Sequence, residues 1–261
     1  MPARDDLTLL IDAAEQAGQI ARRYWRRDPQ VWDKGGDAGP VCEADLAVND
    51  YLSDTLRGAR PDYGWLSEES PDEPSRLDAQ RVFIVDPIDG TRAFIDGQDG
   101  FSHSLAIAEG DRITAAVVFL PVRGALYAAS ATGPALLNGK PIAPSDPALD
   151  QAQVLTNRAS LDAVFWRGRS VPPFKRAFRS SLAWRFCLVA EGRFDAALSV
   201  RAAWEWDIAA GALIAARAGA TVTDVKGAPM RFNNPGARVN GLLVAGPGLH
   251  GQIASRLSPL P

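Results

Sequence analysis

Apolar positions recur at helical spacing in both halves of the chain. From Asp5 to Arg27, alanine, leucine and isoleucine residues fall every three or four positions, so one face of a helix is apolar. A second helix is predicted from Val41 to Leu56. More strongly apolar helices are predicted at 180–192, where a glycine ends the pattern, and at 208–218. A last helix is expected at 249–257.

Short runs of β-branched and aromatic residues between turn residues predict strands. The predicted strands are residues 63–66, 82–85, 101–108, 112–120, 124–129, 194–200, 221–224 and 242–245. Short turns join the third, fourth and fifth of these runs, which predicts an antiparallel or mixed meander behind the strand that ends at Asp86. Because Pro87 lacks a backbone donor, we expect it to stop that strand from continuing as a central ladder. His103 is predicted to be a core or interface residue of its strand rather than a ligand.

Stretches rich in glycine, proline and serine predict the loops and one boundary. Residues 32–40 contain Gly35, Gly36 and Gly39 and are expected to form a mobile loop, and residues 71–80 a polar surface loop. Residues 133–147 are the candidate boundary between two halves, 1–145 and 146–261. We expect the halves to form one compact unit with the site between them.

Composition excludes several classes of function. The chain has 261 residues, of which 46% are hydrophobic and 23% charged, as is ordinary for a globular protein. A net charge of −3 offers no basic field for a nucleic-acid polymer. No apolar run approaches the ~18 residues of a membrane span, and the N-terminus lacks a signal-peptide core. The two cysteines, Cys42 and Cys187, lack metal-ligand spacing, so a reduced cytoplasm is expected.

The candidate chemistry lies where the strand at 82–85 ends. Asp86 and Asp89 are three residues apart, and Asp89-Gly90-Thr91 suits a tight turn that opens a helix. Carboxylates hold hard cations, and the N–H groups of a helix start hold phosphate. Asp-Pro and Asp-Gly are also common turn dipeptides, so this stretch alone favours a plain turn over a metal site. The acidic segments 67–70 and 204–207 supply the further carboxylates that a site with several metal ions needs.

The hexapeptide Asp86-Pro-Ile-Asp-Gly-Thr91 has acidic partners in a characteristic order. Preceded by Glu68-Glu69 and followed by Glu205-Trp-Asp207, it resembles the inositol monophosphatase superfamily of Mg²⁺-dependent, lithium-sensitive phosphatases. The resemblance extends from Lys34 to about Gly246. It implies an α+β fold of alternating α-β-α-β-α layers, two or three Mg²⁺ ions per site, a small phosphate ester as substrate, and a homodimer.

The resemblance also implies roles for individual residues. Glu68, Asp86 and the carbonyl of Ile88 would hold a first ion, and Asp86, Asp89 and Asp207 a second. Backbone N–H groups of Gly90 and Thr91 would cradle the phosphate, while the Thr91 hydroxyl, Asp45 and Glu68 would act on the attacking water. Without the resemblance, Asp45 would be interpreted as a first-turn helix acid. The family usually has Thr where Cys42 stands, which removes one hydroxyl from the edge of the site. The remaining candidate substrate contacts are Lys34, Ser181, Arg201 and Glu205.

The substrate is less constrained than the reaction. Inositol monophosphatases resemble one another in an acidic residue that grips the inositol hydroxyls, and the corresponding position here is the apolar Val200. The chain looks more like the bacterial 3′(2′),5′-bisphosphate nucleotidases, in which Arg201 would pair with the second phosphate. That branch often has Tyr-Pro-Arg where 198–201 stand, and only the arginine is kept. Inositol phosphate, another sugar phosphate, fructose bisphosphate, and a non-catalytic phosphate-binding role are the alternatives.

Overall fold

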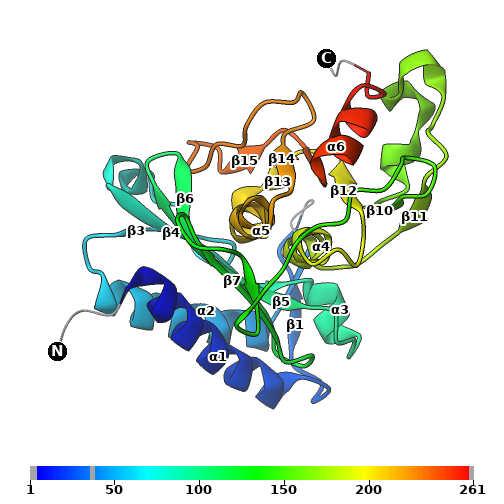
Figure 1. Ribbon diagram of the computed structural model, residues 1–261. Coiled ribbons are helices and arrows are strands. Elements are labelled where there is room, and N and C mark those ends of the chain that lie inside the picture. The colour runs from blue at the N-terminus through cyan, green and yellow to red at the C-terminus, as the bar shows by residue number, and fades with distance from the viewer. Residues whose placement is uncertain (1–4, 36–38, 259–261) are drawn as a thin grey trace.

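Helices and sheets alternate in five layers in the computed structural model, which describes residues 5–35 and 39–258 (Figure 1). The outer layer is formed by α1 (Asp6–Tyr24) and α2 (Glu43–Ala59), which pack on one face of a seven-stranded sheet. The other face of that sheet is covered by α4 (Leu182–Ala190) and α5 (Glu205–Ala218). A five-stranded sheet and then α6 (Pro247–Ala254) complete the stack. The predicted α-β-α-β-α layering is confirmed, and each long helix ends within three residues of its predicted bounds.

The larger sheet is a meander with one parallel edge pair. Its strands, in spatial order, are β3 (Gly64–Ser67), β4 (Arg81–Asp89), β5 (Ser102–Glu109), β6 (Arg112–Leu120), β7 (Ala125–Ser130), β8 (Leu136–Leu137) and β9 (Lys140–Pro141). β3 and β4 are parallel, and every later pair is antiparallel. The predicted end of β4 at Asp86 was wrong. The ladder to β5 shifts register after Asp86 and resumes at Asp89, so an irregularity accommodates Pro87.

The smaller sheet belongs to the C-terminal part of the chain. Its strands, in spatial order, are β11 (Lys175–Ala177), β10 (Gln153–Thr156), β12 (Ala196–Ser199), β16 (Leu242–Ala245) and β14 (Thr221–Thr223). The strands β10 and β11 were not predicted, because each is only three or four residues long and is surrounded by polar loop sequence. The 3-10 turns at 159–161, 163–165 and 167–169 lie between them.

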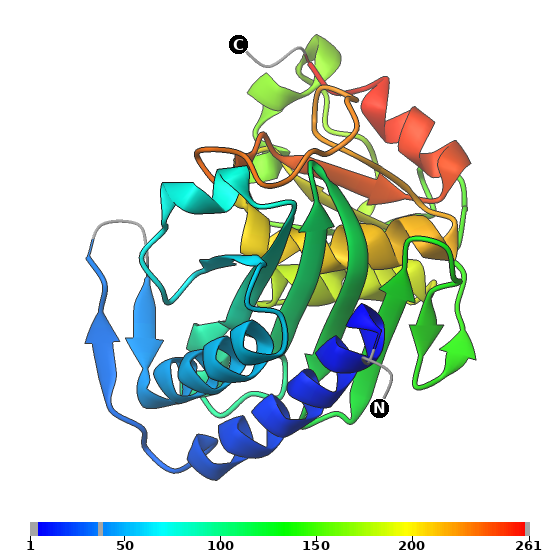
Figure 2. The same ribbon diagram turned by 90° about the vertical axis from the view of Figure 1, so that its left-hand side faces the viewer.

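Several short elements lie outside the two main sheets. β1 (Val31–Asp33) and β2 (Pro40–Cys42) pair antiparallel in a ribbon that stands beside α2 in Figure 2, so the predicted loop at 32–40 was wrong at both of its ends. Gly36, part of the predicted mobile loop, lies outside the described residues. A second ribbon pairs β13 (Ala203–Trp204) with β15 (Arg238–Val239), and the expected loop at 71–80 contains a 3-10 helix, η1 (Pro74–Asp78).

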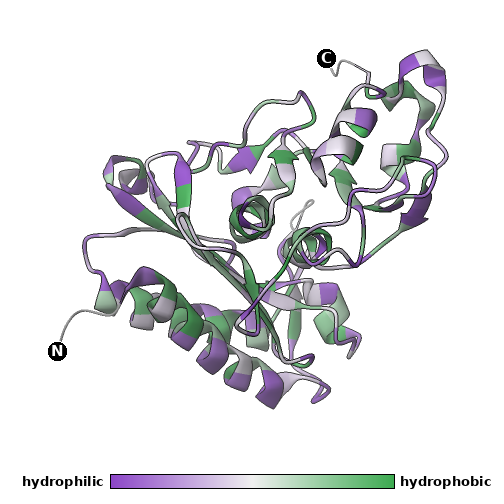
Figure 3. Ribbon diagram, in the orientation of Figure 1, coloured by the Kyte–Doolittle hydropathy of each residue, from purple (hydrophilic) through white to green (hydrophobic). Residues whose placement is uncertain are grey.

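The middle helices, α4 and α5, contact both sheets. α4 and α5 are apolar around much of their surface (Figure 3), as expected for helices that lie between two sheets. A Cβ atom on Gly211 of α5 would lie 2.6 Å from the Cβ of Phe186 on α4, so this glycine lets the two helices approach closely. Among the described residues, no helix is long and apolar enough to cross a membrane. Since β9 ends at Pro141 and β10 starts at Gln153, we keep the boundary between the halves at 145 and 146 as a proposal.

Candidate active site

Three carboxylates from separate segments converge at the end of the parallel pair of strands, β3 and β4. Glu68 follows β3, Asp86 lies in β4, and Asp207 lies in the first turn of α5. One oxygen of each lies within 4.8 Å of the other two. β3 and β4 run parallel, so their C-terminal ends lie side by side. The helix α5 packs on the face of the sheet that includes β4. The structure thus brings together three of the predicted metal ligands.

The electrostatics of this cluster favour a bound cation. Asp86 is 1% exposed, and its Oδ1 has no hydrogen-bond partner among the described residues. Burial raises the pKa of Asp86 well above its ordinary value, and the charges of Glu68, Asp89 and Asp207 raise that pKa further. The pKa of Asp207 is raised in the same way. Crowded, oxygen-only donors of this kind fit a hard divalent cation such as Mg²⁺, whose charge would offset theirs.

Asp89 is directed at the start of α4 rather than at the centre of the cluster. Its Oδ2 accepts hydrogen bonds from the Ser181 hydroxyl at 2.7 Å and from the N–H of Ala183 at 2.6 Å. Its Oδ1 accepts one from the N–H of Leu182 at 3.1 Å. Burial raises the pKa of Asp89 although these hydrogen bonds oppose the rise. Oδ2 already accepts two hydrogen bonds, and only Oδ1 keeps a lone pair that these contacts do not use, so coordination of a second ion by Asp89 through Oδ1 stays a proposal.

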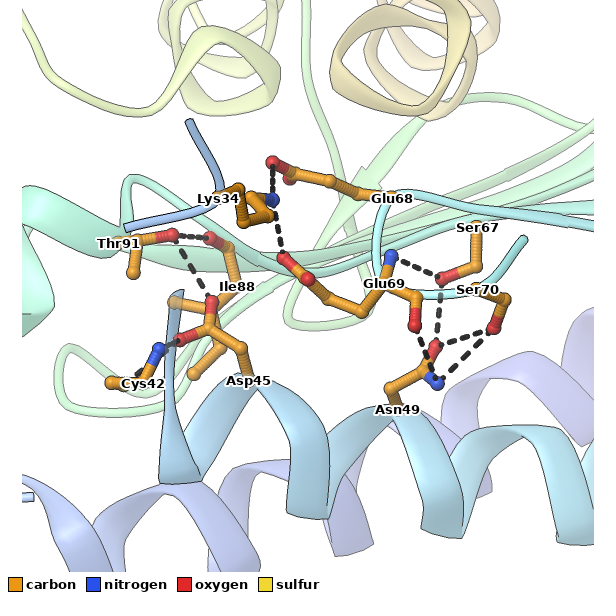
Figure 4. Close-up of polar contacts among 10 residues, drawn as sticks. All are labelled: Lys34, Cys42, Asp45, Asn49, Ser67, Glu68, Glu69, Ser70, Ile88 and Thr91. Carbon is orange, nitrogen blue, oxygen red and sulfur yellow. Dashed lines mark hydrogen bonds and ion pairs between the residues drawn. The ribbon is translucent and has the colours of Figure 1, made fainter. Parts of the chain in front are cut away.

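The candidate water-positioning group consists of Thr91 and Asp45. The Thr91 hydroxyl lies 3.0 Å from Asp45 Oδ1 and 3.2 Å from the carbonyl oxygen of Ile88 (Figure 4). The other oxygen of Asp45 accepts hydrogen bonds from the backbone N–H of Cys42 at 2.9 Å and from its thiol at 2.8 Å. The Cys42 thiol therefore replaces the expected threonine hydroxyl as a donor at the start of α2. Burial raises the pKa of Asp45 to about 6.

The turn between β4 and α3 (Thr91–Ile95) depends on a glycine. Gly90 has a φ of 101°, in the left-handed region, and a Cβ there would lie 3.4 Å from the backbone oxygen of Gly100 and the nitrogen of Ser181. The first hydrogen bond of α3 runs from the N–H of Phe94 to the Gly90 carbonyl at 3.1 Å. The N–H groups of Gly90 and Thr91 precede this bond and have no partner within the helix. They are the groups predicted to cradle phosphate.

Lys34 lies beside the acidic cluster. Its Nζ donates to Glu68 Oε1 at 2.7 Å and to Glu69 Oε1 at 2.8 Å (Figure 4). Burial alone would lower the pKa of Lys34, but attraction by Glu68 and Glu69 outweighs it and raises that pKa. The lysine is therefore a permanent cation at the edge of the site, and its contacts in this structure are with carboxylates.

Two predicted substrate contacts have other partners in the structure. The Ser181 hydroxyl is fully buried, binds Asp89, lies 3.0 Å from the Ser102 hydroxyl, and caps α4 by accepting from the N–H of Trp184 at 2.9 Å. Glu205 is fully buried, and its carboxylate accepts hydrogen bonds from the backbone and side chain of the segment at 233–234. Their polar atoms position neighbouring segments in this way, and contact of either residue with substrate stays a prediction.

Arg201 is exposed, and its guanidinium makes no hydrogen bond or ion pair within residues 5–35 and 39–258. The predicted pairing of Arg201 with a second phosphate stays a prediction. A nearer arginine was missed by sequence reasoning. Arg185, on α4, is buried, its Nε donates to the carbonyl of Arg179 at 2.7 Å, and it exerts a Coulombic attraction on Asp89. A lone charge inside the apolar run at 182–190 was the signal that could have identified it.

His103 is a core residue, as predicted. It is fully buried in β5, and its Nδ1 lies 2.5 Å from the carbonyl oxygen of Pro87. Burial lowers the pKa of His103 to about 4, so the ring is neutral at pH 7. A neutral imidazole in this position donates its Nδ1 hydrogen to the carbonyl and thereby supports the irregular segment between Asp86 and Asp89.

Comparison with known proteins connects this geometry to a family. The inositol monophosphatase family model matches residues 4–259. The 3′(2′),5′-bisphosphate nucleotidase CysQ of Escherichia coli strain K12 is 32% identical over 252 residues, which cover 87% of this chain and 98% of that protein. The inositol-1-monophosphatase of Rhizobium meliloti is 32% identical over 247 residues, covering 85% and 86%. The solved structure of the Thermotoga maritima IMPase superposes with a TM-score of 0.83 at 28% identity, covering 97% and 96%.

The order of the acidic segments, the layered fold and these matches agree with one another along nearly the whole chain. The relatives named above are phosphatases by name, and the fold comparison extends over both sheets and the helices between them. The chain therefore belongs to the inositol monophosphatase family.

Proposed function

We propose that the protein is a Mg²⁺-dependent hydrolase of phosphate monoesters. The observation that carries this proposal is the convergence of Glu68, Asp86 and Asp207 within 4.8 Å, in a chain of a phosphatase family. Hydrolysis of such esters is very slow without a catalyst, and enzymes accelerate it mainly by positioning the reactants and offsetting charge. A cation bound by this buried group of carboxylates would both position the phosphate ester and offset its negative charge.

Each residue of the site has a proposed task. Glu68, Asp86 and the Ile88 carbonyl would hold one Mg²⁺ ion, while Asp86, Asp89 and Asp207 would hold a second. Bound Mg²⁺ supplies positive charge that polarises the phosphate and lowers the pKa of water. The N–H groups of Gly90 and Thr91 would then orient the phosphate oxygens.

Thr91 and Asp45 would orient the attacking water. The Thr91 hydroxyl lies within hydrogen-bond distance of Asp45. When the hydroxyl donates a hydrogen bond to Asp45, its oxygen is free to accept a hydrogen bond from water. With its pKa raised to about 6, Asp45 is ionised at pH 7 yet is a stronger proton acceptor than an ordinary aspartate.

We propose adenosine 3′,5′-bisphosphate as the substrate, with AMP and phosphate as products. The named relatives include a bisphosphate nucleotidase and an inositol monophosphatase at the same 32% identity, so identity does not separate them. Two features support the nucleotide. The first is Val200, an apolar residue at the position where an acidic residue would bind the inositol hydroxyls. The second is Arg185, a buried cation close enough to attract Asp89 and Asp207 electrostatically, which adds positive charge near the site for a substrate with two phosphates. Inositol 1-phosphate is the alternative.

Phosphate release with Mg²⁺ tests both parts of the proposal. We expect a specificity constant at least a hundredfold higher for adenosine 3′,5′-bisphosphate than for inositol 1-phosphate, which corresponds to about 2.7 kcal/mol in transition-state binding. A preference for inositol phosphate would replace the nucleotide by the alternative substrate. If no phosphate were released from these two esters or from other phosphate monoesters at saturating Mg²⁺, the hydrolase proposal itself would be contradicted.

Localisation, assembly and inhibition belong to the same proposal. We propose a cytoplasmic homodimer that is inhibited by lithium. The two cysteines, Cys42 and Cys187, are both buried and unpaired, which agrees with a reducing compartment. Sedimentation at micromolar concentration and phosphate release in the presence of LiCl measure the other two properties directly.

A further inference from the structure

Lys34 is held by two adjacent glutamates that differ in their surroundings. Its Nζ lies 2.7 Å from Glu68 Oε1 and 2.8 Å from Glu69 Oε1. The side chain of Glu68 is 20% exposed, whereas that of Glu69 is 3% exposed. One ammonium group therefore shares its hydrogen bonds between a partly accessible carboxylate and an enclosed one.

Only one of these two glutamates belongs to the candidate metal cluster. Glu68 converges with Asp86 and Asp207, and Glu69 does not. The oxygen that Glu68 offers to a cation is on the same carboxylate that accepts from Lys34. An ammonium group at hydrogen-bond distance repels a divalent cation that approaches this carboxylate, so Lys34 and the metal ion compete for Glu68.

Glu69 is held firmly enough to serve as a separate partner of the lysine. The Asn49 side chain on α2 accepts from the Ser67 hydroxyl at 2.8 Å and donates to the Ser70 hydroxyl at 3.2 Å. The Glu69 carbonyl also receives a hydrogen bond from Asn49 at 3.5 Å (Figure 4). These contacts fix the turn at 67–70 on α2, and with it the position from which the Glu69 carboxylate faces Lys34.

We propose that Glu69 is a docking carboxylate for Lys34, and that the Lys34–Glu69 pair sets the affinity of the site for its divalent metal. When a metal ion binds Glu68, the ammonium group keeps its hydrogen bond to Glu69 and gives up the one to Glu68. Lys34 makes metal binding weaker than the carboxylates alone would allow. Glu69 limits that weakening because it holds the ammonium group when Glu68 binds the metal ion. The inference rests on the proposed role of Glu68 as a metal ligand.

Two other roles of these residues predict different outcomes. If Lys34 acted only on the substrate phosphate, its removal would raise the KM for substrate and leave metal affinity in the absence of substrate unchanged. If Glu69 acted only through its negative charge, its removal would weaken metal binding by the same factor whether or not Lys34 is present. Docking requires that the effect of Glu69 depend on Lys34.

Calorimetric titration with MnCl₂ and with MgCl₂, without substrate, separates these roles. The proteins are wild type, Lys34→Met, Glu69→Gln, the double variant, and Lys140→Met as a control that removes an exposed lysine on β9. We expect Lys34→Met to bind metal at least about fivefold more tightly, about 1 kcal/mol, and Lys140→Met to match wild type. Glu69→Gln is expected to weaken binding about threefold with Lys34 present and to change it little in the Lys34→Met background.

Thermal unfolding supplies an independent check that the variants are folded. In chelator, Lys34→Met leaves Glu68 and Glu69 without a counter-ion and should melt below wild type, and added Mg²⁺ should raise its melting temperature by more than that of wild type. Unchanged or weaker metal binding by Lys34→Met, or equal effects of Glu69→Gln in both backgrounds, would overturn the inference. Failure of wild type to bind any divalent metal would instead overturn the proposed function of the site.

Discussion

Hydrogen bonds within the protein hold the side chains of the site in fixed positions. Thr91 is the clearest case, because its one hydroxyl lies within hydrogen-bond distance of both Asp45 and the Ile88 carbonyl. Neither contact involves a carboxylate of the converging trio. The Ile88 carbonyl is a proposed ligand of the first ion, so Thr91 is placed to affect the water and the phosphate more than the metal.

We predict that Thr91→Ala lowers kcat about a hundredfold or more, in the range of a lost catalytic hydrogen bond, and changes Mn²⁺ affinity less than threefold. Thr91→Ser keeps the hydroxyl and should recover most of the rate. Steady-state kinetics at saturating Mg²⁺, with titration calorimetry beside them, measure the two quantities. An unchanged kcat in Thr91→Ala would argue against water positioning.

Asp89 and Asp207 are predicted to act through the metal. Asp89→Asn or Asp207→Asn should each leave less than about a tenth of wild-type activity while the fold persists, because each removes a charge that the cation needs. Asp50→Asn, on the exposed face of α2, is the matched control and should keep full activity. Circular dichroism confirms folding, and more residual activity than a tenth would remove that aspartate from the ligand set.

His103 gives the stability of the fold a defined response to acid. Its pKa is lowered by burial to about 4, from 6.5. Between these values the unfolded chain binds more protons, so stability present above pH 6.5 is lost as the pH falls through about 4. From pH 7 to pH 5 this loss amounts to about 2 kcal/mol.

Urea unfolding at pH 7 and pH 5 tests this prediction. His103→Gln should lose most of that difference in unfolding free energy, while His250→Gln, at a less buried histidine whose pKa burial also lowers, should lose less of it. The same pH response in wild type and His103→Gln would mean that other groups dominate acid destabilisation.

At the scale of elements, a buried polar network fixes the start of α5. Arg76 of η1 is 2% exposed and donates to Asp72 at 2.6 Å and 3.0 Å, to the Asn233 side chain at 2.5 Å, and to the Asn234 carbonyl at 2.9 Å. The backbone N–H groups of the same two asparagines donate to Glu205, the first residue of α5. The network therefore links an N-terminal loop to the helix turn that carries a candidate metal ligand.

Arg76→Met is predicted to lower the free energy of unfolding by about 2 kcal/mol, because it removes a buried guanidinium and with it all four of its hydrogen bonds. It should also weaken metal binding, since Asp207 lies two residues beyond Glu205. Arg231→Met removes an ion pair between exposed partners, Arg231 and Asp111, and should cost less than about 1 kcal/mol. Equal destabilisation by both substitutions, in urea unfolding at one pH, would contradict a special role for Arg76.

The elements also explain what could be read from the sequence. Hydrophobic patterning located the outer helices because each buries one regular face, and it located the strands of the meander because they are nearly continuous apolar runs between turns. It did not show that β4 passes Pro87, since that depends on a register shift against β5. Nor could it assign Glu205 and Ser181, whose partners at 233–234 and at Asp89 are distant in sequence. The contact of Glu69 with Lys34 also joins segments that are distant in sequence.

For the whole molecule, the layered order brings several favourable features to one place. The parallel strands β3 and β4 end where two helices of the middle layer begin, and the Asp89 carboxylate receives backbone hydrogen bonds from α4 while Asp207 lies in the first turn of α5. Helix N-termini favour negative charge, which offsets part of the repulsion among the carboxylates. The raised pKa values of Glu68, Asp86 and Asp207 indicate that repulsion and burial still dominate.

This balance predicts opposite effects of one substitution with and without metal. In chelator, Asp86→Asn removes one buried charge from the cluster and should unfold at the same temperature as wild type or a higher one. With Mg²⁺ at a hundred times its Kd, wild type should gain about 2.7 kcal/mol, whereas Asp86→Asn should gain little. Asp54→Asn, an exposed change on α2, should follow wild type in both conditions. If Asp86→Asn instead unfolded at a lower temperature in chelator, the charge of Asp86 would be stabilising the protein by itself, and the cluster would not require a cation.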